Sequence, residues 1–135
     1  MKIVYSPPPN YEAIVAAFPA ITQRYGVLFA YGDTIYNPDG VTVTAPLMAH
    51  EEVHCRQQGD TPGLWWESYI ENATYRFGQE LEAHRAEWKK FLEDAPNRHQ
   101  RRGYLSNIAH RLSSGLYGKM CSLANAKILI GGLDE

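Results

Sequence analysis

The five residues from His50 to His54 spell H-E-x-x-H, and this spacing is useful chemically only on an α-helix. Residues four apart in a helix lie one turn apart on the same face, so both imidazoles can reach one metal ion. Glu51, next to the first histidine, falls beside the coordination position that stays open for a water molecule. The stretch therefore predicts a helix that carries two metal ligands and a candidate general base.

Helix and strand signals place this stretch after a small sheet and before a series of helices. Pro46 opens its helix, where the missing N–H is harmless, and the breaker cluster at 59–63 closes it. Short β-prone runs separated by turn signals predict an antiparallel meander over 27–31, 34–36 and 41–44. Apolar residues at spacings of three and four predict helices over 11–18, 64–77, 79–92 and 120–130.

These elements predict an α+β fold, in which a small N-terminal antiparallel sheet packs on a predominantly helical body. A chain of 135 residues with 44% hydrophobic residues is long enough for one core, so we expect one domain over 1–135. No disulfide is needed to hold such a core. Cys55 and Cys121 lack CxxC spacing and are expected to be reduced and buried.

Charge and hydropathy exclude some classes of partner. The formal net charge of -2 argues against nucleic acid, because phosphate binding needs a surplus of Lys and Arg. The basic run at 98–102 is interpreted as a solvated helix start or loop. No apolar run approaches the roughly 20 residues of a membrane span, and no secretory signal precedes the prolines at 7–9. We therefore expect a cytoplasmic protein that does not bind membranes.

A third metal ligand is needed for a catalytic site, because such sites use three protein ligands and keep one position for water. The string Glu80-Leu81-Glu82-Ala83-His84 offers three candidates on one predicted helix. Glu80 and Glu82 are about 200° apart around a helix, so they cannot both face one ion.

These motifs resemble those of the gluzincins, the metallopeptidase group to which thermolysin belongs. Gluzincins pair H-E-x-x-H with a glutamate in E-x-x-A-D or a similar string, and Gln57 matches an H-x-x-Q extension of small gluzincin-like domains. The likeness covers about a third of the chain, from 41 to 87, and its size is closest to minimal, partly phage-associated members. It implies a zincin-like active-site helix, Zn²⁺ as cofactor, and His50, His54 and Glu80 as its ligands.

The resemblance implies a zinc peptidase that hydrolyses a protein or peptide substrate. Zinc lowers the pKa of its bound water and polarises the substrate carbonyl, while Glu51 takes the proton and passes it to the leaving amine. A donor to the developing oxyanion is expected as well. Tyr117 is the first candidate for this catalytic role, with Tyr104 and His110 as alternatives.

His84 departs from the family pattern, which has Asp or Asn at that place. It could support a ligand through a hydrogen bond, or it could bind the metal itself. A fourth protein ligand would close the site, as in structural zinc sites, and would favour a non-enzymatic interaction module or a phage structural component. A nucleic-acid hydrolase is a weaker hypothesis that rests on the basic run at 98–102.

Residues near the motif are interpreted as structural. Glu52 points about 100° away from Glu51 and is expected to be solvated. Cys55 is expected to be a buried thiol turned away from His54. The aromatic residues Trp65, Trp66 and Tyr69 are expected to fill the core, although they could also line a substrate cleft.

Overall fold

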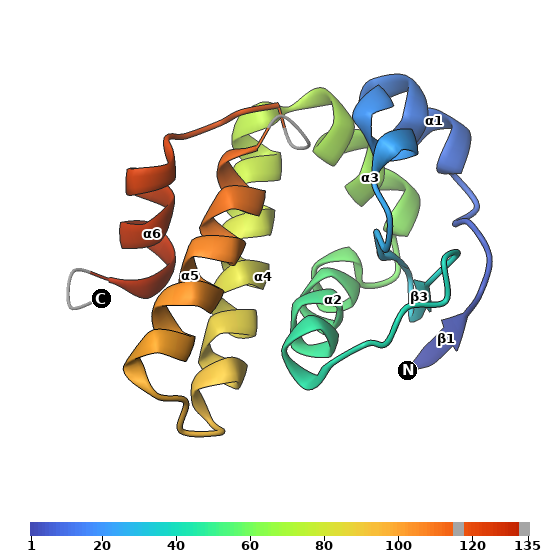
Figure 1. Cartoon of the computed structure of the whole chain (residues 1–135). Coiled ribbons are helices and arrows are strands. Elements are labelled where there is room, and N and C mark those ends of the chain that lie inside the picture. The colour runs from blue at the N-terminus through green and yellow to red at the C-terminus, as the bar shows by residue number, and fades with distance from the viewer. Residues whose placement is uncertain (115–117, 133–135) are drawn as a thin grey trace.

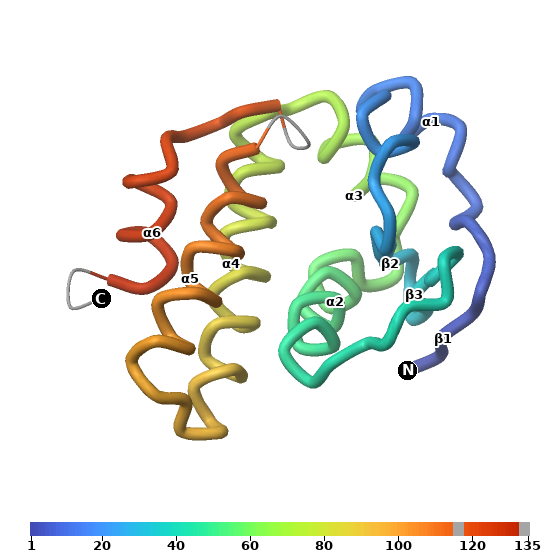
Figure 2. The backbone as a smooth tube through the Cα atoms, in the orientation of Figure 1, coloured from blue at the N-terminus to red at the C-terminus, as the bar shows by residue number. Residues whose placement is uncertain are grey.

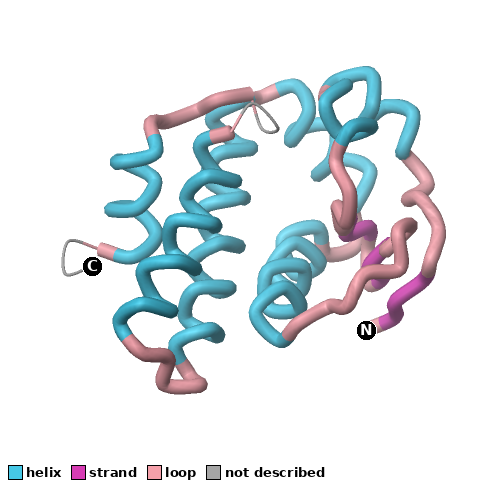
Figure 3. Tube along the Cα trace, in the orientation of Figure 1, coloured by secondary structure: helices cyan, strands magenta, loops and turns pink. Residues whose placement is uncertain are grey.

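The computed structural model describes residues 1–114 and 118–132. A small sheet and six α-helices form an α+β fold, as predicted (Figures 1 and 3). The elements in chain order are β1 (Lys2–Val4), α1 (Tyr11–Ala17), the 3-10 helix η1 (Pro19–Gln23), β2 (Phe29–Tyr31), β3 (Thr34–Tyr36), α2 (Ala45–Gln58), α3 (Pro62–Glu71), α4 (Ala73–Leu92), α5 (Arg98–Ser113) and α6 (Leu123–Gly131).

The sheet has the order β1-β3-β2, and it is mixed rather than purely antiparallel. β2 and β3 form the predicted antiparallel hairpin around the turn at Gly32, whose φ is +65°. The third strand is β1, which pairs parallel to β3, so the predicted strand at 41–44 is wrong. Instead, the side chain of Asn37 holds the backbone of Val41 in a turn through two hydrogen bonds of 2.8 and 3.1 Å.

α2 lies in the middle of the molecule, between the sheet and the three C-terminal helices (Figures 1 and 2). It packs against β2 on one side and against α4 on the other. Thr44 caps its N-terminus by accepting a hydrogen bond from the backbone N–H of Leu47, and Gly59 ends it with a φ of +54°. The predicted helix bounds are thus confirmed to within a residue.

The boundary between the next two helices lies at Asn72, whereas the sequence predicted it at Gly78. The side chain of Asn72 accepts a hydrogen bond of 3.0 Å from the backbone N–H of Tyr75 and so caps α4. Gly78 sits inside α4 with open space beside it. A glycine within a long helix costs about 1 kcal/mol relative to alanine, which the packing of a 20-residue helix can offset.

Two apolar clusters flank α2 and its partner face on α4. The first joins α1, η1 and β2 to α3, and the second joins α4, α5 and α6. Trp65, Trp66 and Tyr69 belong to the first cluster, as predicted for core aromatics. Among residues 1–114 and 118–132, no helix combines the length and the apolarity needed to cross a membrane.

Candidate metal centre

α2 and α4 face each other with polar side chains, and this polar interface lies between the two apolar clusters. Four of the six buried residues of α2 are polar or charged, among them His50, Glu51 and His54. α4 buries Glu80, His84 and Glu87, together with Arg76. Burying this many ionisable groups is costly unless they pair or bind a cation, so the interface between α2 and α4 is the candidate functional site.

Three side-chain atoms meet at the centre of this interface. Nε2 of His50 and Nε2 of His54 lie 3.2 Å apart, and Oε1 of Glu80 lies 3.3 Å from each of them. We call this arrangement the donor triangle. The structure therefore brings together the three residues that the sequence predicted as ligands, in a buried group that could hold a metal ion.

Glu51 borders the donor triangle. Its Oε2 lies 3.6 Å from Nε2 of His50, and the residue is 6% exposed. Burial raises the pKa of the Glu51 carboxyl, although the neighbouring His50 and His54 act in the opposite direction. A raised pKa makes a carboxylate a stronger proton acceptor, which suits a general base.

The second nitrogen of His54 is held by Gln57, one turn away on α2. Nδ1 of His54 and Oε1 of Gln57 lie 2.8 Å apart, while the Gln57 amide donates to the backbone oxygen of Gln79 and to a carboxylate oxygen of Glu82. These bonds fix the ring so that Nε2 faces Glu80. Gln57, noted in the sequence as part of H-x-x-Q, thus has a defined orienting contact.

Glu80 is fixed by Tyr69 of α3. The Tyr69 hydroxyl donates a hydrogen bond of 2.5 Å to Oε2 of Glu80, which leaves Oε1 at the donor triangle. The sequence assigned Tyr69 to the core, and its hydroxyl role was missed because apolar spacing does not show where a phenol group points.

Glu87 was missed by the sequence and is fully buried beside the donor triangle. Its Oε1 lies 3.0 Å from Nδ1 of His50 and 3.3 Å from Nδ1 of His84. Its Oε2 accepts hydrogen bonds from the Tyr104 hydroxyl, at 2.8 Å, and from Arg111, at 2.5 Å. Glu87 follows Glu80 by seven residues, two helical turns, and this spacing was the signal that could have found it.

His84 lies between Glu80 and Glu87 on the same face of α4. Its Nε2 is 3.9 Å from Oε1 of Glu80. Together with His50 and Glu87 it forms a second buried group that could hold a metal ion, but it does not belong to the group formed by the donor triangle. Burial, followed by the effect of His50, lowers the pKa of His84 to about 4, so the ring is neutral at pH 7.

The charges of the site favour a bound cation. Burial by itself lowers the pKa of His50, but hydrogen bonds to Glu80 and Glu87 outweigh burial and raise it to about 10. The pKa of His54 is raised as well, because the carboxylate of Glu80 outweighs burial. The pKa values of Glu80 and Glu87 are held well below their usual range, since contacts with the histidines outweigh burial. The carboxylates therefore stay ionised and attract positive charge, as a proton or as a metal ion.

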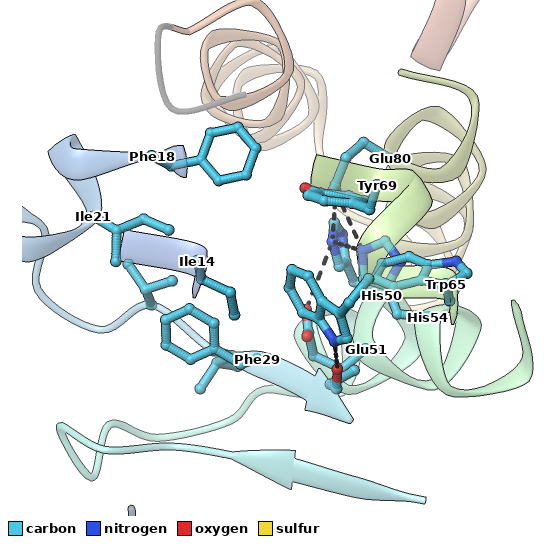
Figure 4. Close-up of a pocket in the computed structure, with 14 residues that line it drawn as sticks. Ile14, Phe18, Ile21, Phe29, His50, Glu51, His54, Trp65, Tyr69 and Glu80 are labelled. Carbon is cyan, nitrogen blue, oxygen red and sulfur yellow. Dashed lines mark hydrogen bonds and ion pairs between the residues drawn. The ribbon is translucent and has the colours of Figure 1, made fainter. Parts of the chain in front are cut away.

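A mainly apolar cavity of about 70 Å³ opens onto the donor triangle (Figure 4). Ile14 of α1, Ile21 of η1 and Phe18 between these two helices face Tyr69, Glu80 and the histidines across it. One water needs about 10–15 Å³ of such space, so the cavity can admit a water and a small apolar group. Trp65, Trp66 and Tyr69 line this cavity while packing in the core, and their role beside a substrate stays a prediction.

The predicted oxyanion donors have different locations. Tyr117 lies outside the described residues. The Tyr104 hydroxyl is engaged with Glu87, and His110 is exposed on α5; neither lines the cavity at the donor triangle.

Cys55 is buried as predicted, and burial raises the pKa of its thiol to about 11, which keeps the sulfur protonated and a poor ligand. The basic run at 98–102 starts α5, as predicted.

Comparison with family models, with curated proteins and with solved structures gives no match for this chain.

Proposed function

We propose that the chain is a zinc-dependent peptidase of the gluzincin type, with His50, His54 and Glu80 as the metal ligands. The observation that carries the proposal is the size of the donor triangle. Donors bonded to one tetrahedral zinc ion at about 2.0–2.1 Å lie about 3.3–3.4 Å apart. The sides of the triangle are 3.2, 3.3 and 3.3 Å, so a zinc ion fits with little movement of the side chains.

The hydrogen bonds around the triangle support the same conclusion. Metal-binding histidines usually hold their second ring nitrogen against a carboxylate, a carbonyl or a water. Nδ1 of His50 faces Glu87, and Nδ1 of His54 faces the amide oxygen of Gln57. Both rings therefore present Nε2 to the ion, in the tautomer that zinc binding requires.

Zinc held there would supply an acidified water and polarise a carbonyl oxygen. Glu51, at the border of the triangle, accepts the proton of the attacking water and delivers it to the amine that leaves. His50, His54 and Glu80 would hold the ion with three protein ligands, as catalytic zinc sites do, and the adjoining apolar cavity could receive a substrate side chain. The resemblance to gluzincins adds a peptide bond as the reacting group.

The experiment compares Glu51→Gln with the matched variant Glu52→Gln. Glu52 is the next residue on the same helix, it is half-buried, and it does not line the cavity at the triangle. Wild type and both variants should bind about one zinc per chain by metal analysis. Cleavage of a peptide library should disappear in Glu51→Gln and persist in Glu52→Gln. Equal activity of the two variants, or no zinc in the wild type, would refute the proposal.

A further inference from the structure

A second cavity, of about 170 Å³, is lined in part by His50 and Glu51. These two residues line both cavities, so the second cavity is adjacent to the donor triangle. Its other described lining residues are Arg24, Tyr25, Gly26, Val27, Leu28, Leu47 and Arg111. Two arginines and one carboxylate thus face this space, in contrast to the mainly apolar first cavity.

Arg24 comes from the loop between η1 and β2, and this loop is anchored. The backbone N–H of Gly26 donates a hydrogen bond of 2.7 Å to the Asp39 carboxylate. Gly26 has a φ of +82°, and an added Cβ would lie 3.2 Å from Val41, so only glycine fits this position without strain. Arg24 itself is exposed, and it forms no ion pair with any acidic side chain in the part of the chain that the structure describes.

Arg111 comes from α5, on the opposite side of the cavity. Its guanidinium binds Oε2 of Glu87, which also holds Nδ1 of His50 through Oε1. The Arg111 side chain remains 29% exposed at the cavity. Its position is therefore set by the same carboxylate that orients the metal ligand.

We propose that this cavity binds a carboxylate of the substrate, placed within one residue of the bond that is cleaved. Arginine is the side chain best suited to this task, because its planar guanidinium presents paired donors to a carboxylate. Arg24 is the principal partner, since it forms no ion pair with Glu51 or with any other acidic side chain of the described residues. The ligand is either the C-terminal carboxylate of a peptide or the side chain of Asp or Glu.

The charge balance of the region agrees with an anionic ligand. A zinc ion and Arg111 together offset the three buried carboxylates Glu51, Glu80 and Glu87. Arg24 then adds one positive charge at the mouth of the site, and a substrate carboxylate neutralises it. The inference rests on the proposed peptidase function only for the ligand being a peptide.

Binding of matched peptides to the zinc-loaded Glu51→Gln protein, measured by titration calorimetry, tests the proposal without hydrolysis. One short peptide is prepared with a free C-terminus and as its amide. Two further amides carry an internal Asp or Asn at the same place. We expect about tenfold or tighter binding of the free acid over its amide, or of the Asp peptide over its Asn partner.

Two second-site variants show whether Arg24 is responsible. Arg24→Gln should abolish the discrimination, and Arg102→Gln, at an exposed position of α5, should retain it. Equal binding of acid and neutral peptides, no binding of any peptide, or discrimination that survives Arg24→Gln would overturn the proposal. The last result would mean that another positive group, such as Arg111 or the metal ion, binds the carboxylate.

Cleavage by the wild type separates this inference from the proposed function. If acidic peptides bind more tightly than neutral ones but no peptide is cleaved, the carboxylate site is supported and the peptidase function is refuted. If peptides are cleaved but acidic and neutral ones bind equally, the carboxylate site is refuted and the peptidase function is supported.

Discussion

Oε1 of Glu87 lies 3.0 Å from Nδ1 of His50, and this contact connects the metal centre to the C-terminal helices. The opposite oxygen of Glu87 accepts from Tyr104 and Arg111, both on α5. α5 and α6 line no part of the apolar cavity, yet α5 holds the carboxylate that orients a metal ligand. α5 therefore supports the candidate site through Glu87, a side chain of α4.

Glu87→Gln should weaken zinc binding. The amide keeps the shape but loses the charge that favours the required tautomer of His50, and comparable substitutions cost about 10–100-fold in metal affinity. Competition with a chromophoric zinc chelator measures the change. Glu93→Gln, at the C-cap of α4 and paired at the surface with Lys90, should bind zinc like the wild type. Unchanged affinity in Glu87→Gln would contradict the orienting role.

Gln57 and Gln58 are neighbours whose substitution by alanine should have different effects, on zinc affinity and on stability respectively. Gln57→Ala removes the acceptor for Nδ1 of His54 and should lower zinc affinity by about 10–100-fold with little loss of stability. Gln58 is buried, and its amide joins α2 to the β2–β3 hairpin through Ala30 and Gly32, at 2.8 and 2.7 Å. Gln58→Ala leaves the Gly32 N–H without its acceptor, while the Ala30 oxygen keeps its hydrogen bond from Trp66, and should cost about 1–3 kcal/mol of unfolding free energy.

Zinc titration and urea unfolding, done on both variants, separate the two effects. The prediction fails if Gln58→Ala loses zinc affinity at full stability, or if Gln57→Ala unfolds as readily as Gln58→Ala.

The sequence predicted the fold correctly at helix ends and turns, where the conformation of one residue determines the course of the backbone. Pro46 and Gly59 mark the two ends of α2, and the turn at Gly32 fixes the hairpin, so these features could be read from the sequence. The capping role of Thr44 was missed, because this residue was assigned to a strand. The parallel pairing of β1 could not, because it joins Lys2 to Thr34 across α1 and η1, and strand propensity carries no information on distant partners. Asn72 and Gly78 were confused as helix boundaries because tertiary packing overrode the weak preference of glycine.

The proximity of His50 and His54 was predictable because helical spacing puts both side chains on one face. Glu80 came from a likeness to known motifs. Contacts such as Tyr69 with Glu80, or Arg111 with Glu87, depend on how α3 and α5 pack on α4. Such contacts follow from the assembled fold, and no local pattern encodes them.

His84→Asn distinguishes an open catalytic site from a closed structural one. The donor triangle does not include His84, whose Nδ1 faces Glu87 at 3.3 Å. We therefore expect the variant to keep one zinc per chain and to keep its peptidase activity, with lower stability from the space left in the core. His110→Asn, at an exposed position, controls for the loss of a histidine. Loss of zinc from a folded His84→Asn protein would instead support a closed, non-enzymatic site.

The metal-free protein should lose stability as pH rises from about 6.5 to about 10. Folded His50 keeps its proton up to a pKa of about 10, and the pKa of His54 is also raised, whereas both release theirs near 6.5 when unfolded. The folded state thus binds more protons in this window, and the linkage relation makes unfolding easier with increasing pH. Below pH 6.5 this contribution is fully present. Thermal unfolding in chelator should show the decline, and His50→Gln should reduce it. Bound zinc takes the place of these protons, so the zinc-loaded protein should not lose stability over the same range. A metal-free protein that becomes more stable as pH rises would contradict the assigned charges.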